Sequence, residues 1–281
     1  MPKFSLIVPT RSRPQELVQL FNSLREQTFK DFEVVLIDQN GDQATLDVVN
    51  EFTRSGGVII HLRPGPLPLS AARNVGLRKV TGEFIGFPDD DCHYPPGLLA
   101  DVLREMEVGK LDILSCRGEE PLTGRPLLSS FPNKRTEFTL SNLLGIGMSI
   151  TLFFRASCIQ DLFFDEELGV GRPAGSGEES DFLFKAFHKG ARGAYVIGPK
   201  VFHPYPLQRF DQLARERAYR YGLGYGIVMR RYWSLASVPS FLRGLVIRPI
   251  GGMVLSLFSP GRFLWCLATL KGRWKGFLLG V

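Results

Sequence analysis

The chain has 281 residues, which is enough for one large domain with an appendage or for two modest domains, and its core can be sizeable without a disulfide or metal staple. The net charge is +6, but the first 216 residues hold all 28 acids and 24 of the 34 lysines and arginines, whereas ten cations follow Glu216 with no acid among them. A body of net charge −4 and an apolar tail of +10 argue against nucleic acid as the partner and indicate two surfaces with different partners.

The first half of the chain alternates short apolar runs with helical patterns. Runs rich in β-branched residues predict buried strands, and leucines at helical spacing between them predict helices, so the pattern favours a mostly parallel sheet covered on both faces. We expect strands at 4–9, 32–38, 58–62 and 84–87 and helices at 13–27, 44–52 and 70–79. Further along, we expect strands at 113–116 and 149–154, and a glycine-rich loop at 169–177 before a helix at 179–189.

Polar residues follow several of these strands. The carboxyl ends of parallel strands lie along one edge of a sheet, and ligands bind there in open sheets. The residues at these strand ends are Pro9, Thr10, Arg11, Asp38, Asp89, Asp90 and Asp91.

The acidic triplet directly follows the apolar run FIGF. Asp89 and Asp91 are two residues apart and can hold a hard divalent cation from one side, leaving its other side to phosphate oxygens. A solvated loop face is the plain alternative for such a run, but its place after a buried strand favours a metal site.

Five segments in this order give the chain a specific likeness. They are SLIVPTRSRP, VVLIDQNG, LSAARNVGL, FIGFPDDDCHYPPGLL and SGEESDFLFKAFHKG. Together they resemble the motifs of inverting family-two glycosyltransferases with a GT-A fold, over roughly Pro2 to His203. The resemblance implies a Rossmann-like α/β catalytic domain at residues 1–206.

This resemblance implies a donor site at the strand ends. It places the nucleoside at Pro9, Thr10, Arg11 and Asp38, and the DxD motif on Asp89 and Asp91, with Asp90 also on the donor side and Asp91 as the direct ligand of Mg²⁺ or Mn²⁺. It sets Arg73 and Asn74 opposite the donor, where the guanidinium suits either a pyrophosphate or a structural bond to the acidic loop. It also sets His203 near the metal and diphosphate.

Inversion at the anomeric carbon of the sugar requires a base on the acceptor side, which takes the proton from the attacking hydroxyl. The resemblance points to Glu179, with Asp181 as the competitor, although this chain has Glu where Asp is commoner in the family. Acids in the first turn of a helix also stabilise its dipole and need no further reason.

The tail, residues 207–281, is apolar, aromatic and basic, but none of its uncharged runs reaches the roughly 20 residues that span a bilayer. Helices lying in the membrane interface against anionic headgroups are one account, and packing on the catalytic domain or on another copy is the other. The four scattered cysteines lack metal spacing and no signal peptide is apparent, which favours a reducing cytoplasm. With the basic tail, we expect a peripheral protein on the cytoplasmic face of the cell membrane.

The function expected is metal-dependent, inverting transfer of a sugar from a nucleotide-sugar donor to a membrane-bound, polyprenyl-diphosphate-linked saccharide in surface polysaccharide synthesis. A noncatalytic nucleotide-sugar-binding or membrane scaffold protein is the alternative. A nucleotidyltransferase would normally carry a glycine-rich, basic loop after the first strand, and PTRSRP is not such a loop.

Overall fold

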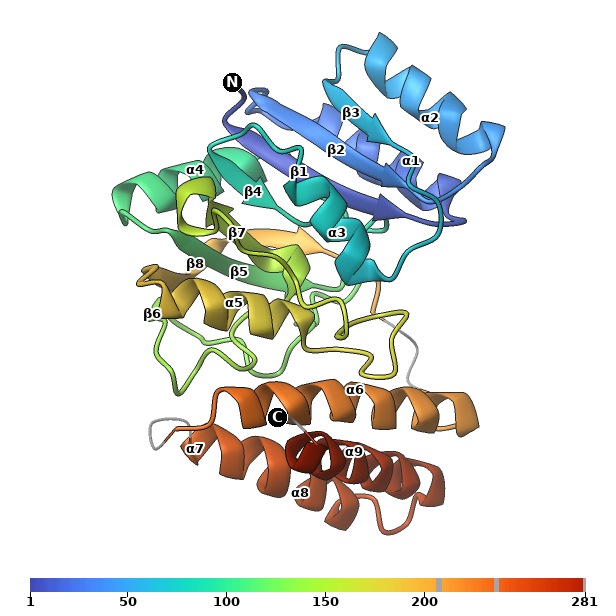
Figure 1. Cartoon of the computed structure of the whole chain (residues 1–281), viewed down its shortest axis with the longest axis vertical. Helices are drawn as coiled ribbons and strands as arrows, with labels where there is room; N and C mark the ends of the chain where they lie inside the picture. Colours follow the sequence, from blue (N-terminus) through green and yellow to red (C-terminus); the bar gives the residue numbers. More distant parts are fainter. Residues whose placement is uncertain (206–208, 235–237, 280–281) are drawn as a thin grey trace.

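The computed structural model describes residues 1–205, 209–234 and 238–279. Figure 1 shows an α/β part above and a layer of helices below it, with helix α6 next to the α/β part. The predicted border between residues 206 and 207 lies outside the described residues.

The α/β part is built on one eight-stranded sheet in the order β3-β2-β1-β4-β7-β5-β8-β6. The four strands β3, β2, β1 and β4 pair in parallel, β7 runs antiparallel to β4 and β5, and β5 and β8 are again parallel. The strands are β1 (Phe4–Thr10), β2 (Phe32–Asp38), β3 (Ile59–Leu62), β4 (Phe84–Gly86), β5 (Ile113–Glu119), β6 (Thr136–Glu137), β7 (Leu152–Arg155) and β8 (Gly193–Phe202).

Hydrophobic cores lie on both faces of this sheet. Phe4, Leu6 and Val8 of β1 pack with helices α1, α2 and α4, while Ile7 packs with α3 and α5 on the other face. Every residue of β1 and β2 is buried, as continuous apolar runs in a parallel sheet require. The helices of this part are α1 (Pro14–Arg25), α2 (Gln43–Arg54), α3 (Leu69–Leu77), α4 (Leu98–Val108) and α5 (Glu178–His188).

Two long helices dominate the lower layer. Asp211 caps the first of them, because its side chain accepts a hydrogen bond of 2.8 Å from the backbone nitrogen of Ala214. Glycines allow the two to lie backbone against backbone: a Cβ on Gly226 would stand 2.1 Å from the carbonyl oxygen of Arg273. The layer consists of α6 (Gln212–Arg231), α7 (Val238–Phe241), the π-helix η4 (Leu242–Ile247), α8 (Arg248–Val254) and α9 (Pro260–Leu279).

Among the helices in the described part of the chain, none combines the length and apolar content needed to cross a bilayer. The predicted strands and helices are confirmed with small shifts at their ends. One expected strand is shorter, because Ser149–Thr151 forms a 3₁₀ turn, η1, before β7 begins. The two-residue strand β6 was not predicted, since so short a segment has no periodic pattern.

Candidate active site

A cavity of about 530 Å³ opens at the edge of the sheet where β1 and β4 end. Its wall includes residues from the ends of β1, β4 and β8, which are far apart in the sequence. The sequence-predicted residues that line it are Pro9, Thr10, Arg11, Asp89, Asp90, Asp91 and His203. The sheet topology therefore brings most of the predicted donor and metal residues together.

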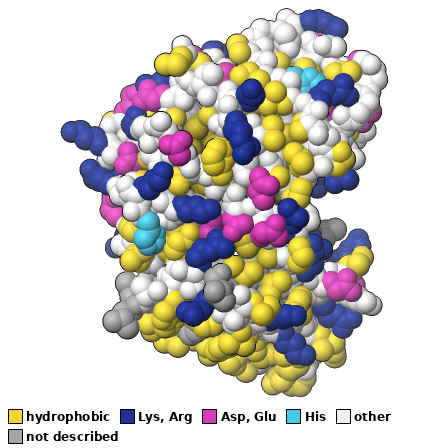
Figure 2. All heavy atoms as spheres, in the orientation of Figure 1, with side chains coloured by type: hydrophobic (Ala, Val, Ile, Leu, Met, Phe, Trp, Pro, Cys, Tyr) yellow, Lys and Arg dark blue, Asp and Glu magenta, His cyan; other side chains and the backbone are white. Residues whose placement is uncertain are grey.

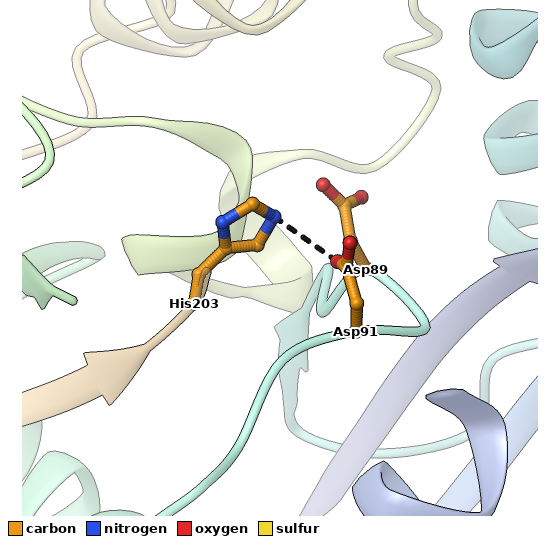
Figure 3. Close-up of side chains that lie close together, drawn as sticks. All are labelled: Asp89, Asp91 and His203. Carbon is orange, nitrogen blue, oxygen red and sulfur yellow. Dashed lines mark ion pairs between the residues drawn. The ribbon is translucent and has the colours of Figure 1, made fainter. Parts of the chain in front are cut away.

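The metal-binding candidates Asp89, Asp91 and His203 point toward one another (Figure 3). One potential ligand atom from each lies within 4.8 Å of the other two. Nε2 of His203 is 3.0 Å from an oxygen of Asp91, and its Nδ1 donates a hydrogen bond of 2.7 Å to the carbonyl oxygen of Pro204. This second bond orients the ring so that Nε2 faces the carboxylates.

The charges of this group favour a cation. Burial alone would lower the pKa of His203, but its hydrogen bond to Asp91 and the charges of Asp91 and Asp89 raise it above its ordinary value. Burial alone would raise the pKa of Asp91, yet His203 and Arg13 bring it below its usual range. Asp91 is therefore an ionised carboxylate in a half-enclosed place, and a divalent ion could replace the proton of His203 there.

The middle acid, Asp90, holds the loop in place. Its oxygens accept hydrogen bonds from the hydroxyl of Thr10 at 2.8 Å and from Arg13 at 3.2 Å, and Arg13 also contacts Asp91 at 2.8 Å. Burial raises the pKa of Asp90 to about 6, against the effect of Thr10 and Arg13. Arg13, which the sequence analysis missed, lines the cavity and partly neutralises the acidic triplet.

The structure gives Arg73 the second of its two expected roles. Its side chain is 1% exposed and bonds to Asp89 at 3.0 Å, to Ser149 at 2.9 Å and to Glu178 at 3.3 Å. The guanidinium thus ties the acidic loop to the start of α5 and lies behind the cavity wall.

Two predicted donor residues have other partners. The amide of Asn74 donates to the carbonyl oxygen of Phe164 and to Glu166, both at 3.0 Å, so it fixes that loop rather than facing the donor. Asp38 is fully buried, lies 2.9 Å from His61 and accepts from the backbone nitrogen of Asn40. Its carboxylate is therefore already occupied, and the next residue, Gln39, lines the cavity.

The two candidates for the base differ in their surroundings. Asp181 is completely buried; its oxygens lie against Arg231 and Lys185 (2.5 and 2.7 Å), and Tyr232 donates to it at 2.9 Å. These contacts place Asp181 at the junction with α6, where its carboxylate already has three partners. Glu179 remains half-buried at the start of α5.

The helical layer also contributes to the cavity. Arg217 and Tyr221 of α6 line it, although the sequence analysis assigned them to the tail. The glycine-rich loop before α5 is fastened to the same helix, since Gly175 donates to the carbonyl oxygen of Arg220 and Ser176 to that of Tyr221. The sequence feature that could have identified Arg217 and Tyr221 is their spacing, which puts a charged and an aromatic side chain one helical turn apart.

Comparison with known proteins agrees with this geometry. The model of the family described as Glycosyl transferase family 2 matches residues 5–163, more than half of the chain. The chain belongs to this family. It is a glycosyltransferase with the GT-A fold, which sets aside the noncatalytic scaffold and the nucleotidyltransferase.

Several relatives of this family-two glycosyltransferase act on large saccharides or polymers. It is 27% identical to a Campylobacter jejuni protein, GalNAc(5)-diNAcBac-PP-undecaprenol beta-1,3-glucosyltransferase, over 80% of this chain and 72% of that one. It is 30% identical to the Staphylococcus aureus poly(ribitol-phosphate) beta-N-acetylglucosaminyltransferase TarS, over 72% of this chain but only 35% of TarS.

Solved structures show the same fold. The crystal structure of S. aureus TarS matches 99% of this chain and 55% of its own with a TM-score of 0.63 at 23% identity. The Pyrobaculum calidifontis mannosyltransferase PcManGT, solved with GDP-Man and Mn²⁺, matches 98% of this chain and 87% of its own with a TM-score of 0.67 at 15% identity.

Proposed function

We propose that the protein is a metal-dependent, inverting glycosyltransferase that moves a sugar from a nucleotide-sugar to a hydroxyl of a membrane-bound, polyprenyl-diphosphate-linked saccharide. The observation that carries this proposal is the group of Asp89, Asp91 and His203 inside a cavity of about 530 Å³ at the sheet edge. The Campylobacter relative, whose name specifies an undecaprenol-linked acceptor, supports the acceptor class.

The residues present fit a divalent ion. Two carboxylates and one imidazole suit Mn²⁺, which accepts oxygen and nitrogen ligands, and Mg²⁺ would take the carboxylates alone with phosphate oxygens. Such an ion would supply Lewis-acid stabilisation of the departing nucleoside diphosphate. The Mn²⁺ in the Pyrobaculum neighbour supports this choice.

The chain's own residues then perform the remaining tasks. Glu179 takes the proton from the acceptor hydroxyl as its oxygen bonds to the anomeric carbon, and the bond from that carbon to the diphosphate oxygen breaks with its electrons leaving on the diphosphate. Arg11 and Arg217, which line the cavity, offer positive charge to the phosphates. Attack opposite the leaving group inverts the anomeric configuration.

The helical layer supports a membrane-bound acceptor. Several of its apolar side chains are exposed, among them Leu255 (80%), Leu257 (64%) and Phe258 (103%). Figure 2 shows hydrophobic side chains gathered over the lower layer, with lysines and arginines among them. This layer would lie in the interface of an anionic membrane, on its cytoplasmic face, and bring the cavity close to lipid-linked substrates.

A transfer assay tests the proposal. Purified protein is incubated with radiolabelled UDP-, GDP- or dTDP-sugars, Mn²⁺ and a polyprenyl-diphosphate-linked saccharide, and the anomeric configuration of the product is read by NMR. We expect transfer with inversion that a chelator abolishes. Retention of configuration, or transfer that persists in chelator, would contradict the proposed mechanism.

A further inference from the structure

Three arginines of the helical layer surround one tyrosine. Arg243 and Arg248 line a small cavity beside Tyr225, and Arg273 of α9 lies over the tyrosine ring with its guanidinium carbon 4.4 Å from the ring centroid. Among the described residues, no carboxylate is within ion-pair distance of any of the three.

Packing holds this cluster in position. Arg273 donates a hydrogen bond to the carbonyl oxygen of Gly244, in the π-helix η4. A Cβ on Gly244 would stand 2.2 Å from the hydroxyl oxygen of Tyr225, so only glycine allows this approach. π-helical turns are rare and occur frequently at functional sites. The backbone that carries Arg243 is therefore fixed against both Tyr225 and Arg273.

The cluster keeps positive charges together at a cost. Burial and the neighbouring charge of Arg243 lower the pKa of Arg248, and burial and Arg248 lower that of Arg273. In addition, Nε of Arg273 is buried without a hydrogen-bond partner. A guanidinium stays protonated in proteins, so a bound anion would offset the repulsion between Arg243 and Arg248.

The cavity has the size and lining of an oxyanion site. Its volume of about 120 Å³ is much smaller than the 530 Å³ of the cavity at the sheet edge and suits a phosphate group. Ser130, Ser141, Asn142 and Ser240 line it beside the arginines; the amide of Asn142 donates to the carbonyl oxygen of Glu137 and the hydroxyl of Ser240 to that of Ser141, so the arginines are the groups left to bind an anion. Guanidinium groups are usual partners of bound phosphate.

We propose that Arg243 and Arg248, supported by Arg273 and Tyr225, form a binding site for a phosphate group, separate from the glycosyl-transfer cavity. Exposed apolar side chains flank both arginines, namely Leu242 (47%), Ile247 (62%) and Ile250 (43%). A phospholipid headgroup would offer its phosphate to the arginines and its acyl chains to these side chains. A free phosphate offers the same chemistry without the chains.

A charge-conserving variant tests this site. Arg243→Lys/Arg248→Lys keeps both positive charges but removes the forked geometry, and Arg215→Lys/Arg262→Lys makes the same exchange elsewhere in the helical layer. Each protein is titrated with inorganic phosphate by calorimetry and floated with phosphatidylcholine vesicles with and without phosphatidylglycerol. The affinity of each variant for nucleotide-sugar shows whether it is folded. Arg248→Lys alone is measured as well, because it is the milder substitution.

We expect the affinity for phosphate to fall about tenfold in Arg243→Lys/Arg248→Lys and to stay unchanged in the control. A parallel loss of binding to phosphatidylglycerol vesicles identifies a lipid headgroup as the source, and unchanged vesicle binding identifies a soluble phosphate. Equal binding of both probes by the two variants, or no phosphate binding by the wild type, would overturn the site. These outcomes do not depend on the proposed donor site, whose affinity for nucleotide-sugar is titrated separately.

Discussion

The arginines of the two parts of the molecule have different surroundings. In the α/β part, Arg73 is 1% exposed and lies against the carboxylates of Asp89 and Glu178. In the helical layer, Arg243 and Arg248 lie beside Tyr225 with no described acid as partner. Arg73 therefore joins the acidic loop to the start of α5, whereas Arg243 and Arg248 are exposed and have no described carboxylate at ion-pair distance.

The boundary between the two parts contains both an ion pair and residues that line the candidate active site. Asp181 of α5 and Arg231 of α6 are paired across it. Arg217 and Tyr221, from the same helix α6, face the candidate active site. The helical layer thus forms part of the wall of the candidate active site.

The largest effect is expected from Glu179→Gln, which removes the proposed base and leaves the helical layer intact. Loss of a general base lowers kcat about 10²- to 10⁴-fold. Nucleotide-sugar affinity should stay at the wild-type value, because the donor side of the cavity is untouched. Steady-state kinetics and calorimetry check both expectations, and a wild-type kcat would remove Glu179 from this role.

Asp181→Asn weakens the junction between the α/β part and the helical layer. It leaves Arg231 with Asp165 as its remaining carboxylate, at 2.9 Å, so we expect the free energy of unfolding to fall by about 2–3 kcal/mol. The rate per folded molecule should change far less than in Glu179→Gln. Urea unfolding followed by circular dichroism measures the stability, and a stable variant without activity would reverse the roles of the two acids.

Gly226→Ala tests the packing of the helical layer alone. The new Cβ would meet the carbonyl oxygen of Arg273 at 2.1 Å, so α6 and α9 must separate, at a cost of about 1–3 kcal/mol. Gly251→Ala in α8 is the matched control, because nothing lies within 4 Å of its Cβ. Equal melting temperatures for the two variants would show that the close contact of α6 with α9 is wrong.

A pH dependence of the stability is also expected. Burial raises the pKa of Glu178 from 4.5 to about 8, the charge of Glu179 adds to this, and Arg73 opposes it. The folded protein therefore holds this proton more tightly than the unfolded chain, and the stability it contributes is complete below pH 4.5 and is lost as the pH rises through 8.

Glu178→Gln should make the free energy of unfolding flatter between pH 4.5 and pH 8. The exposed Glu167 (78%) supplies the control substitution Glu167→Gln, which should keep the wild-type slope. Urea unfolding at a series of pH values distinguishes the two. A wild-type slope in Glu178→Gln would show that Glu178 is ionised in the folded protein.

Much of the α/β part could be predicted because its strands are continuous apolar runs and its site residues follow them directly. Asp89 and Asp91 are examples, since their position after FIGF already indicates a strand-end site. Arg13 and Gln39 were missed because their roles depend on side chains that reach the cavity from within loops.

Contacts between distant segments could not be predicted. Helical spacing shows which face of α5 a residue occupies but not which element covers it. The pairing of Asp181 with Arg231, the competitor of Glu179 as base, therefore could not be predicted. For the same reason, Arg217 and Tyr221 were identified as tail residues although α6 places them in the cavity.

Calorimetric titration with UDP-, GDP- and dTDP-sugars, in Mn²⁺ and in chelator, tests whether the acidic triplet binds a metal ion together with the donor diphosphate. Asp91→Asn is measured beside Asp101→Asn, a control on the surface of α4. We expect one donor class to bind only in the presence of the metal. Asp91→Asn should abolish this binding, and the control should preserve it. Binding that is independent of both metal and Asp91, or no binding of any donor, would contradict a metal-diphosphate site at the acidic triplet.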